Sequence, residues 1–223
     1  MATLTPHPDT TRRNLGGGFY SLGDLRAYLG YSGSPQDGEH ALPWLRVLNP
    51  VSHRTRHADY SFSDLISLFV VRELLRKGVR PRAVRDAERY LRRLWKTDRP
   101  LVSDQIQTDG RNVFPKGEPI AGQLEAADLR GQQTMREMVK DKLTDVHYSD
   151  GMAAYWTPSE HVQLDPRVQF GEPVIVGTRV PTETVAGVAR LVGPQGAASR
   201  FDVSLLAAQS AIGFEDKLAS VLA

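Results

Sequence analysis

The sequence predicts a mainly α protein with a small β-rich connecting region between two helical parts. Apolar residues at helical spacing recur through residues 19–97 and again through the last part of the chain. Between these parts, Asp109-Gly110 separates two short runs rich in Val, Ile and Phe, which is a hairpin signal. The stretch Gly171–Thr184 is β-branched and punctuated by Gly and Pro, which predicts a buried strand, a bend and a helix start.

The composition is that of an ordinary globular protein, with 223 residues of which 40% are apolar and 24% charged. The absence of cysteine excludes disulfides, thiolate catalysis and cysteine-ligated metal sites. Met1–Asn14 lacks the apolar core of a signal peptide, and no apolar run approaches membrane-spanning length. We therefore expect a soluble cytoplasmic protein without a membrane partner.

The net charge of +2 conceals an asymmetry along the chain. Residues 1–99 hold 17 Lys and Arg against 10 Asp and Glu (+7), whereas residues 100–223 hold 11 against 16 (−5). This pattern favours a nucleic acid at the basic end and a basic or neutral partner at the other. The alternative interpretation is that the two domains differ in charge by chance, without a charged partner for either.

The basic half begins with a flexible arm. Gly16-Gly17-Gly18 raises the entropic cost of ordering residues 10–18, so this segment is expected to be mobile. Arg12 and Arg13 either reach a phosphate backbone from this arm or remain solvated.

A helix, a turn and a second helix are predicted next. Ser21 and Asp24 form a capping box for the first helix. A Gly- and Ser-rich turn over residues 30–35 precedes an apolar cluster around Trp44, whose short helix is expected to begin near Pro43.

Residues 49–59 form a basic segment where a wing would lie beside DNA. His53 and His57 stand four residues apart, but no further ligand is positioned to complete a metal site, so phosphate contact or solvation is favoured and no metal is expected. The residues that we predict to contact DNA phosphates are Arg12, Arg13, Arg46, His53, Arg54 and Arg56.

Two helices with clear ends follow. Ser61 and Asp64 form a second capping box before a helix that is apolar on most sides and ends at Lys77-Gly78. Pro81 begins the next helix, which should bury its Val, Ala and Leu residues, Leu94 among them. The arginines that should point mostly outward are Arg82, Arg85, Arg89, Arg92 and Arg93.

Residues 100–158 are interpreted as the β-rich connecting region, with the hairpin at Asp109-Gly110 and a turn at Asp150-Gly151. Aspartates are scattered through it, but no pair stands at a known spacing from a histidine. The chain also lacks a Gly-rich phosphate loop and a nucleophile elbow, so an enzyme is not expected and no catalytic residue or cofactor is assigned.

Three short helices are predicted after the bend, and Thr182 is the expected N-cap of the first. This helix should end at Gly193-Pro194 and be followed by helices over 195–201 and 204–214. Arg179 either clamps a carboxylate or phosphate, or hydrogen-bonds to its own carbonyls or to Glu183.

The stretch 164–214 resembles domain of unknown function 433, a helix-turn-helix-like unit associated with VapB-type antitoxins. The resemblance rests on Asp165-Pro166, on the Gly-x-Pro-Val-Ile-x-Gly-Thr-Arg-Val-Pro core and on the closing Ala211-Ile212-x-Phe214-Glu215. Its core residues are Gly171, Pro173, Gly177, Thr178, Arg179 and Pro181.

The stretch 20–95 resembles the MerR-like winged helix-turn-helix domain, through Tyr-Ser-Leu-Gly-Asp-Leu, Trp-Leu, Tyr-Ser-Phe-Ser-Asp-Leu and Leu-Arg-Lys-Gly-Val-Arg. It departs from MerR regulators because no long heptad helix follows Trp95, so their ligand sensing is not carried over. The parts implied are an arm (1–18), a MerR-like winged-helix DNA-binding domain (19–97), the connecting region (98–160) and the domain of unknown function 433 (161–223).

Together the two resemblances imply an antitoxin of a type II toxin–antitoxin pair. Such a protein would bind double-stranded operator DNA, neutralise a PIN-like ribonuclease toxin and autoregulate its operon, as a homodimer matched to a two-fold operator. The alternatives are a stand-alone MerR-like transcriptional regulator without a toxin partner and, less favoured, an enzyme.

Overall fold

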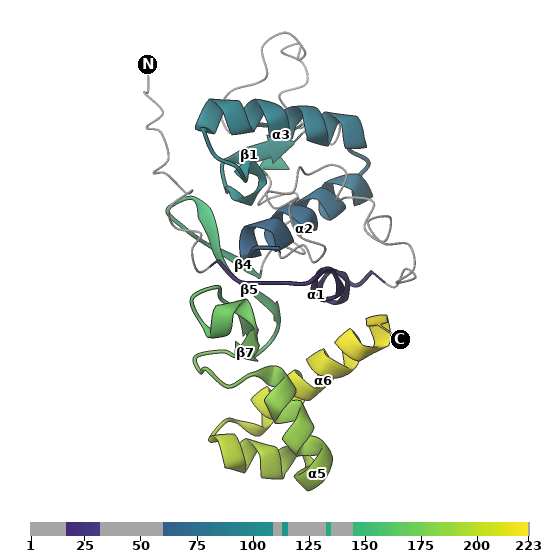
Figure 1. Ribbon diagram of the computed structural model, residues 1–223, viewed down its shortest axis with the longest axis vertical. Helices are drawn as coiled ribbons and strands as arrows, with labels where there is room; N and C mark the ends of the chain where they lie inside the picture. The colour runs from purple at the N-terminus through teal and green to yellow at the C-terminus, as the bar shows by residue number, and fades with distance from the viewer. Residues whose placement is uncertain (1–16, 32–59, 109–112, 116–132, 135–144, 223) are drawn as a thin grey trace.

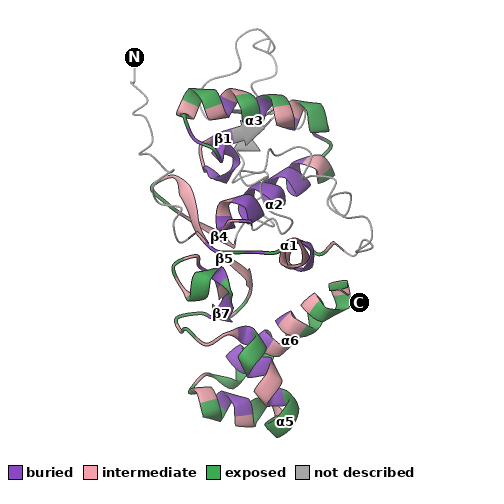
Figure 2. Cartoon of the chain, viewed as in Figure 1, coloured by how far each residue is buried: buried purple, intermediate pink, exposed green. Residues whose placement is uncertain are grey.

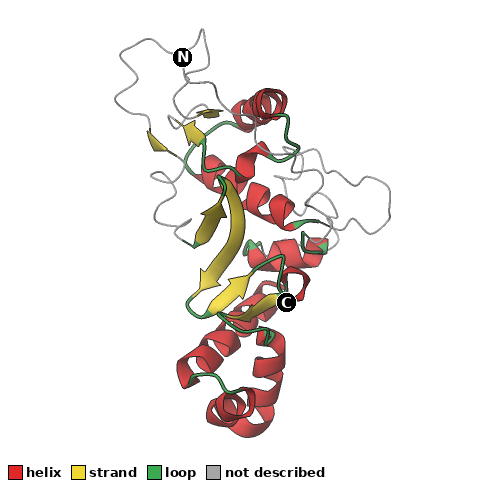
Figure 3. Ribbon diagram, turned by 90° about the vertical axis from the view of Figure 1, so that its left-hand side faces the viewer, coloured by secondary structure: helices red, strands yellow, loops and turns green. Residues whose placement is uncertain are grey.

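The computed structural model describes residues 17–31, 60–108, 113–115, 133–134 and 145–222. The molecule is elongated, with α3 (Pro81–Trp95) at one end and the helical hairpin of α5 (Thr182–Phe201) and α6 (Leu205–Leu222) at the other (Figure 1). A curved antiparallel sheet lies between the two helical ends (Figure 3). No helix in the described ranges combines the length and the apolar character that crossing a membrane requires.

The predicted capping boxes are confirmed. Ser21 caps α1 (Leu22–Tyr28) and Ser61 caps α2 (Phe62–Arg76), and in each the aspartate at the third helical position accepts a hydrogen bond from the cap backbone N–H. Gly78 has a φ of +92° just after the C-cap Lys77, and Pro81 is the first residue of α3, as predicted. Leu94 is an exception, because it is 40% exposed instead of buried.

A small sheet follows the 3₁₀ turn η4 (Pro100–Val102). Its order is β2-β1-β3, and both pairings are antiparallel. The antiparallel pairing of β1 with β2 confirms a hairpin around Asp109-Gly110, but Thr108 pairs with Val113, so the connection has four residues and not the predicted two. The connection itself lies outside the described residues. The strands are β1 (Ile106–Thr108), β2 (Val113–Pro115) and β3 (Gln133–Thr134).

The prediction of a mainly α fold with only a small β-rich connecting region is wrong. A four-stranded antiparallel sheet of order β4-β5-β6-β7 continues past residue 158. Its last strand, β7, is the buried strand predicted before the Gly177 bend, whereas β6 was not predicted. The Asp150-Gly151 turn is confirmed, since both residues have positive φ and join β4 to β5. The strands are β4 (Val146–Ser149), β5 (Met152–Ser159), β6 (Val162–Leu164) and β7 (Pro173–Ile175).

The prediction of a purely helical unit after a single strand at the C-terminus is wrong in its strands, because β6 and β7 both belong to the sheet. The predicted end of the first helix at Gly193-Pro194 is confirmed: Gly193 leaves helical geometry, with a φ of +76°, and α5 consists of two helical segments on either side of it. The second helix of the predicted winged helix-turn-helix, with Trp44, lies outside the described residues.

Buried apolar residues form two clusters. The large core gathers α1, α2, α3, β1 and the first strands of the four-stranded sheet, and Phe214 of α6 reaches it. The second cluster, which we call the alanine core, lies between β7, α5 and α6. Figure 2 shows α2 buried almost throughout, whereas α3 and α5 each carry an exposed outer face.

Candidate functional site

The core motif of the C-terminal segment begins at Gly171, whose backbone the Tyr20 side chain contacts closely. Gly171 has a φ of +89°, and a Cβ there would lie 2.3 Å from the Tyr20 hydroxyl oxygen. That hydroxyl donates a hydrogen bond to the Gly171 carbonyl at 2.9 Å. Gly171 is therefore required both by its backbone conformation and by the approach of Tyr20.

The Gly177-Thr178-Arg179 bend is held by its own hydroxyl. The Thr178 hydroxyl donates to the Ile175 carbonyl at 2.9 Å and accepts from the Val180 N–H at 3.1 Å. Gly177 takes a φ of +76°. The bend leaves Arg179 exposed, and its guanidinium has neither hydrogen bond nor ion pair within the described part of the chain, so neither predicted partner of Arg179 is seen there.

The two prolines of the motif begin the elements that flank the bend. Pro173 opens β7, and Pro181 is the N-cap of α5. The prediction that Thr182 caps this helix is wrong, because Thr182 is its first helical residue. Its buried hydroxyl instead contacts the Glu215 carboxylate of α6 and lies 3.3 Å from the Pro173 carbonyl oxygen.

Two carboxyl groups near the motif have opposite pKa shifts. Burial raises the pKa of Glu215, and the charges of Glu183 and Asp216 raise it further, against the effects of Thr182 and Arg190. Burial would also raise the pKa of Asp165, but hydrogen bonds from the Arg167 side chain and backbone at 2.7–2.9 Å lower it overall.

A cavity of about 460 Å³ opens between α1, the start of α5 and the end of α6. Its carboxylates come from Asp24, Glu172, Glu183 and Glu215. Of the described residues that line it, Arg190 alone carries a positive charge. We call this feature the acidic cavity.

The opposite end of the molecule is cationic. Arg82, Arg89 and Arg93 of α3 and its C-cap Lys96 are all exposed and recur at spacings of seven, four and three residues, which places them along one side of the helix. This α3 stripe runs over fourteen residue steps, or about 21 Å at helical rise. Asp86 lies beside it, 3.7 Å from Arg82 and 4.0 Å from Arg89, and offsets part of the charge.

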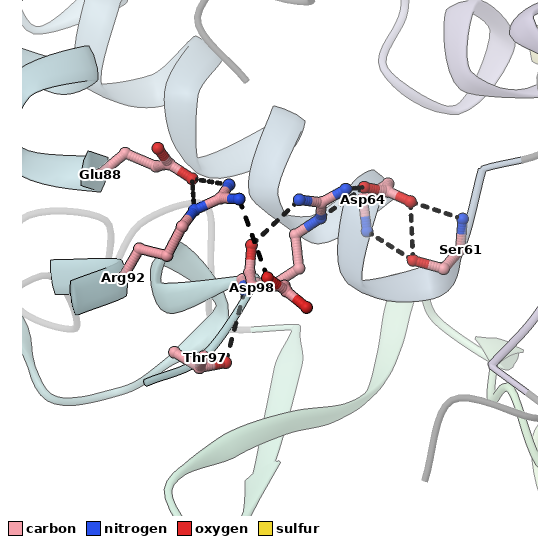
Figure 4. Close-up of polar contacts among 7 residues, drawn as sticks. Ser61, Asp64, Glu88, Arg92, Thr97 and Asp98 are labelled. Atoms are coloured by element: carbon pink, nitrogen blue, oxygen red, sulfur yellow. Dashed lines mark hydrogen bonds and ion pairs between the residues drawn. The ribbon is translucent and has the colours of Figure 1, made fainter. Parts of the chain in front are cut away.

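Buried ion pairs hold this end together. Arg99 donates from Nε to Asp64 Oδ1 at 2.6 Å, and the other oxygen of Asp64 accepts from the Ser61 N–H and hydroxyl. Figure 4 shows the capping box of Ser61 and Asp64 near Arg92. Arg92 donates from Nε to Glu88 at 3.0 Å and lies 3.9 Å from an Asp98 carboxylate oxygen. Arg92 is consequently engaged within the protein, whereas the α3 stripe faces outward.

The residues predicted to contact DNA phosphates, from Arg12 and Arg13 to Arg56, lie outside the described residues. The same is true of the basic segment 49–59 and of His53 and His57. Among the residues that the structure does describe, no group of three or more His, Cys, Asp or Glu is arranged to hold a metal ion.

Comparison with known proteins agrees with part of the resemblance. Residues 162–191, from β6 to the first half of α5, match the family described as protein of unknown function (DUF433). The fold is similar to that of the crystal structure of Rv2018 from Mycobacterium tuberculosis, with a TM-score of 0.59 and 19% identity over 86% of this chain and 96% of that chain. No curated protein matches the sequence.

The contacts of two residues of the site were not predicted from the sequence. No contact was assigned to Tyr20, although the neighbouring Gly18 is also tightly packed, with a hypothetical Cβ only 2.9 Å from the Tyr20 ring. The adjacent glycines were the available signal for a close approach. Glu215 belongs to the closing motif, but its contact with Thr182 carried no such signal, because the two residues are 33 positions apart in the chain.

Proposed function

We propose that this protein is a VapB-type antitoxin of a type II toxin–antitoxin pair. It binds its operator DNA through the cationic half, which is MerR-like, acts as a cytoplasmic homodimer, neutralises a PIN-like ribonuclease toxin and represses its own operon. It is not proposed to be an enzyme. The matched segment 162–191 supports the resemblance from which this proposal comes.

The observation that carries the DNA-binding part is the α3 stripe. Duplex DNA carries one phosphate per strand for about every 3.4 Å of helix axis, so a stripe of about 21 Å parallel to the axis spans the rise of about six base pairs. The carboxylates of Glu73 and Glu88 are buried against arginines, and therefore they do not neutralise the stripe. Further exposed cations flank it at Lys77 and Arg80, and at Arg76, which pairs with Glu73 at 3.3 Å.

The first experiment is a gel shift on the DNA upstream of the gene, at several salt concentrations. The variant Arg82→Ala/Arg89→Ala/Arg93→Ala should bind more weakly, with a salt slope smaller by roughly 2.7 if each arginine contacts one phosphate. The matched control, Arg179→Ala/Arg200→Ala/Lys217→Ala, removes the same charge from exposed positions of the C-terminal segment and should keep the slope. Equal slopes in the two variants would remove the α3 stripe from the interface.

The predicted contacts outside the described residues are tested in the same assay. Arg54→Ala/Arg56→Ala should reduce the salt slope by roughly 1.8. An unchanged slope would remove the basic segment 49–59 from the proposal.

The toxin part is tested by producing the protein together with the product of the neighbouring reading frame and purifying one through a tag on the other. A stable pair with suppressed ribonuclease activity is expected. Binding to upstream DNA without such a pair would instead favour the stand-alone regulator.

A further inference from the structure

The acidic cavity combines an apolar wall with a carboxylate rim. Ala27 of α1, Ala186 of α5 and Leu218 of α6 form part of the wall. Phe19 and Leu222 also line the cavity, and they remain 67% and 49% exposed. A partner that covered these large apolar side chains would bind more tightly, because their burial from water is favourable.

The carboxylates of the rim are short of counter-ions. Glu172 and Glu183 are exposed, and neither forms an ion pair with any described residue. Arg190 lies 3.8 Å from Asp216, so its charge is shared with a carboxylate outside the cavity lining. Asp24 belongs to the capping box of α1, where its carboxylate accepts from the Ser21 N–H and hydroxyl at 2.7 Å.

The titrating groups of the cavity agree with this excess of negative charge. Burial first, and then the neighbouring charges of Asp24, Glu215 and Glu172, raise the pKa of Tyr28. The pKa of Glu215 is raised by burial and by Glu183. A cation placed between these groups would relieve the repulsion among them.

The shape and charge of the acidic cavity indicate which class of ligand fits it. Phosphate-bearing ligands are excluded by repulsion from the rim. A lysine or arginine side chain suits both surfaces, because its aliphatic stem covers apolar wall while its charged head meets the carboxylates. A volume of about 460 Å³ accommodates several side chains of a peptide segment.

We propose that the acidic cavity docks a cationic segment of a protein partner. The inference rests on the proposed function for the identity of that partner. A ribonuclease must present cationic groups to the phosphates of its RNA, and carboxylates that occupy those groups would compete with RNA. The cavity would then neutralise the toxin by covering its RNA-binding surface.

The test uses the full-length chain and the variant Glu172→Gln/Glu183→Gln. Both residues are exposed and have no hydrogen bond to any described side chain, so the fold should be unaffected. The matched control is Glu160→Gln/Asp202→Asn, which removes the same charge at exposed positions outside the cavity lining. Two probes are used: the co-produced neighbouring protein, and a labelled peptide of alternating Lys and Leu compared with its Glu and Leu counterpart.

We expect the Lys and Leu peptide to bind the native chain and the control equally in fluorescence anisotropy. Its affinity should fall about tenfold in the cavity variant, since two charge pairs are lost. The Glu and Leu peptide should not bind. Equal affinity of the Lys and Leu peptide for the two variants, or its failure to bind the native chain, would overturn the proposal.

The two probes, the neighbouring protein and the peptide, together distinguish failure of this inference from failure of the proposed function. If the neighbouring protein purifies with the native chain and the control but not with the cavity variant, both hold. If it purifies equally with all three, the proposed pairing stands and the cavity is not its docking site. If it purifies with none while the peptide still binds as expected, the toxin pairing fails and the cavity remains a site for cationic segments.

Discussion

The two cores of this protein are built from different materials. The large core is filled by bulky side chains that are completely buried, such as Leu25, Leu65 and Leu91, and it also contains the buried Asp64–Arg99 pair. The alanine core consists mainly of alanines on α5 and α6, and Ile175 and Val185 are its bulkiest buried members. Because alanine removes little apolar area from water, the second core gains less stabilisation per residue.

This difference teaches how stability is distributed. The large core draws on α1, α2, α3 and strands of both sheets, so its disruption should unfold the molecule. The α5–α6 hairpin is joined to it through Phe214 and Leu218 of α6. We therefore expect the hairpin to open locally at a lower free energy than the rest.

The largest effect is expected from Asp64→Ala in the large core. This change removes the acidic half of the capping box of α2 and leaves the Arg99 guanidinium buried without its carboxylate. We expect a loss of about 3–5 kcal/mol in the free energy of unfolding. Urea denaturation followed by circular dichroism measures it. Asp86→Ala, which breaks only exposed pairs on α3, should change stability by less than about 1 kcal/mol. Similar costs for the two changes would contradict the importance of the buried pair.

The junction between the two regions is probed by Gly171→Ala. The positive φ and the overlap with the Tyr20 hydroxyl should together cost about 2–4 kcal/mol. Gly177→Ala separates the two causes, because its φ is also positive but no atom lies within 4 Å of the added Cβ, and about 1 kcal/mol is expected. Differential scanning calorimetry compares the stabilities of the two variants. Equal losses of stability would show that the contact with Tyr20 adds nothing to the cost at Gly171.

A smaller effect is expected inside the alanine core. Ala208→Gly should cost about 2 kcal/mol, from helix propensity and the lost buried methyl group. Gln209→Gly, at an exposed position of the same helix, loses propensity alone and should cost about 0.6 kcal/mol. Hydrogen exchange at α6 should accelerate more than at α2 in the Ala208 variant. Equal acceleration in both helices would show that the two cores unfold together.

The smallest effect concerns pH and the contact between α5 and α6. Because folding raises the pKa of Glu215, the folded state binds its proton more tightly, and stability falls as pH rises from the ordinary carboxyl range through the raised value. Glu215→Gln retains an acceptor for Thr182 and lacks the titration. Its stability relative to the native chain should therefore increase with pH across that window. Thermal unfolding from pH 4 to pH 8 measures the difference in stability between the two proteins. A difference that does not change with pH would show that folding does not raise the pKa of Glu215.

The helices of the cationic half could be predicted with their ends, because their signals are local. Ser21 with Asp24 and Ser61 with Asp64 act on backbone groups three residues away. The Asp150-Gly151 turn is equally local. The helix end at Gly193-Pro194 was predictable for the same reason, because Gly tolerates a positive φ and Pro disfavours a continued helix, and Gly193 leaves helical geometry there.

The sheet and the candidate site could not be read in the same way. Assigning β6 and β7 to the sheet with β5 depends on pairing between segments, which short apolar runs do not encode. The hydroxyl of Tyr20 meets Gly171 across 151 positions of sequence, and Arg99 meets Asp64 across 35. The acidic cavity brings together carboxylates of α1, α5, α6 and the segment before β7.

From the sequence alone follow the caps, the hairpin turns, the cationic outer side of α3 and the strand–bend–helix order of the C-terminal motif. In each of these the deciding interaction joins residues within about one turn of one another. The tertiary structure alone decided the extent of the four-stranded sheet, the partners of Tyr20, Arg99 and Thr182, and the gathering of the carboxylates. These features depend on which distant surfaces bury one another, and burial is a property of the assembled fold.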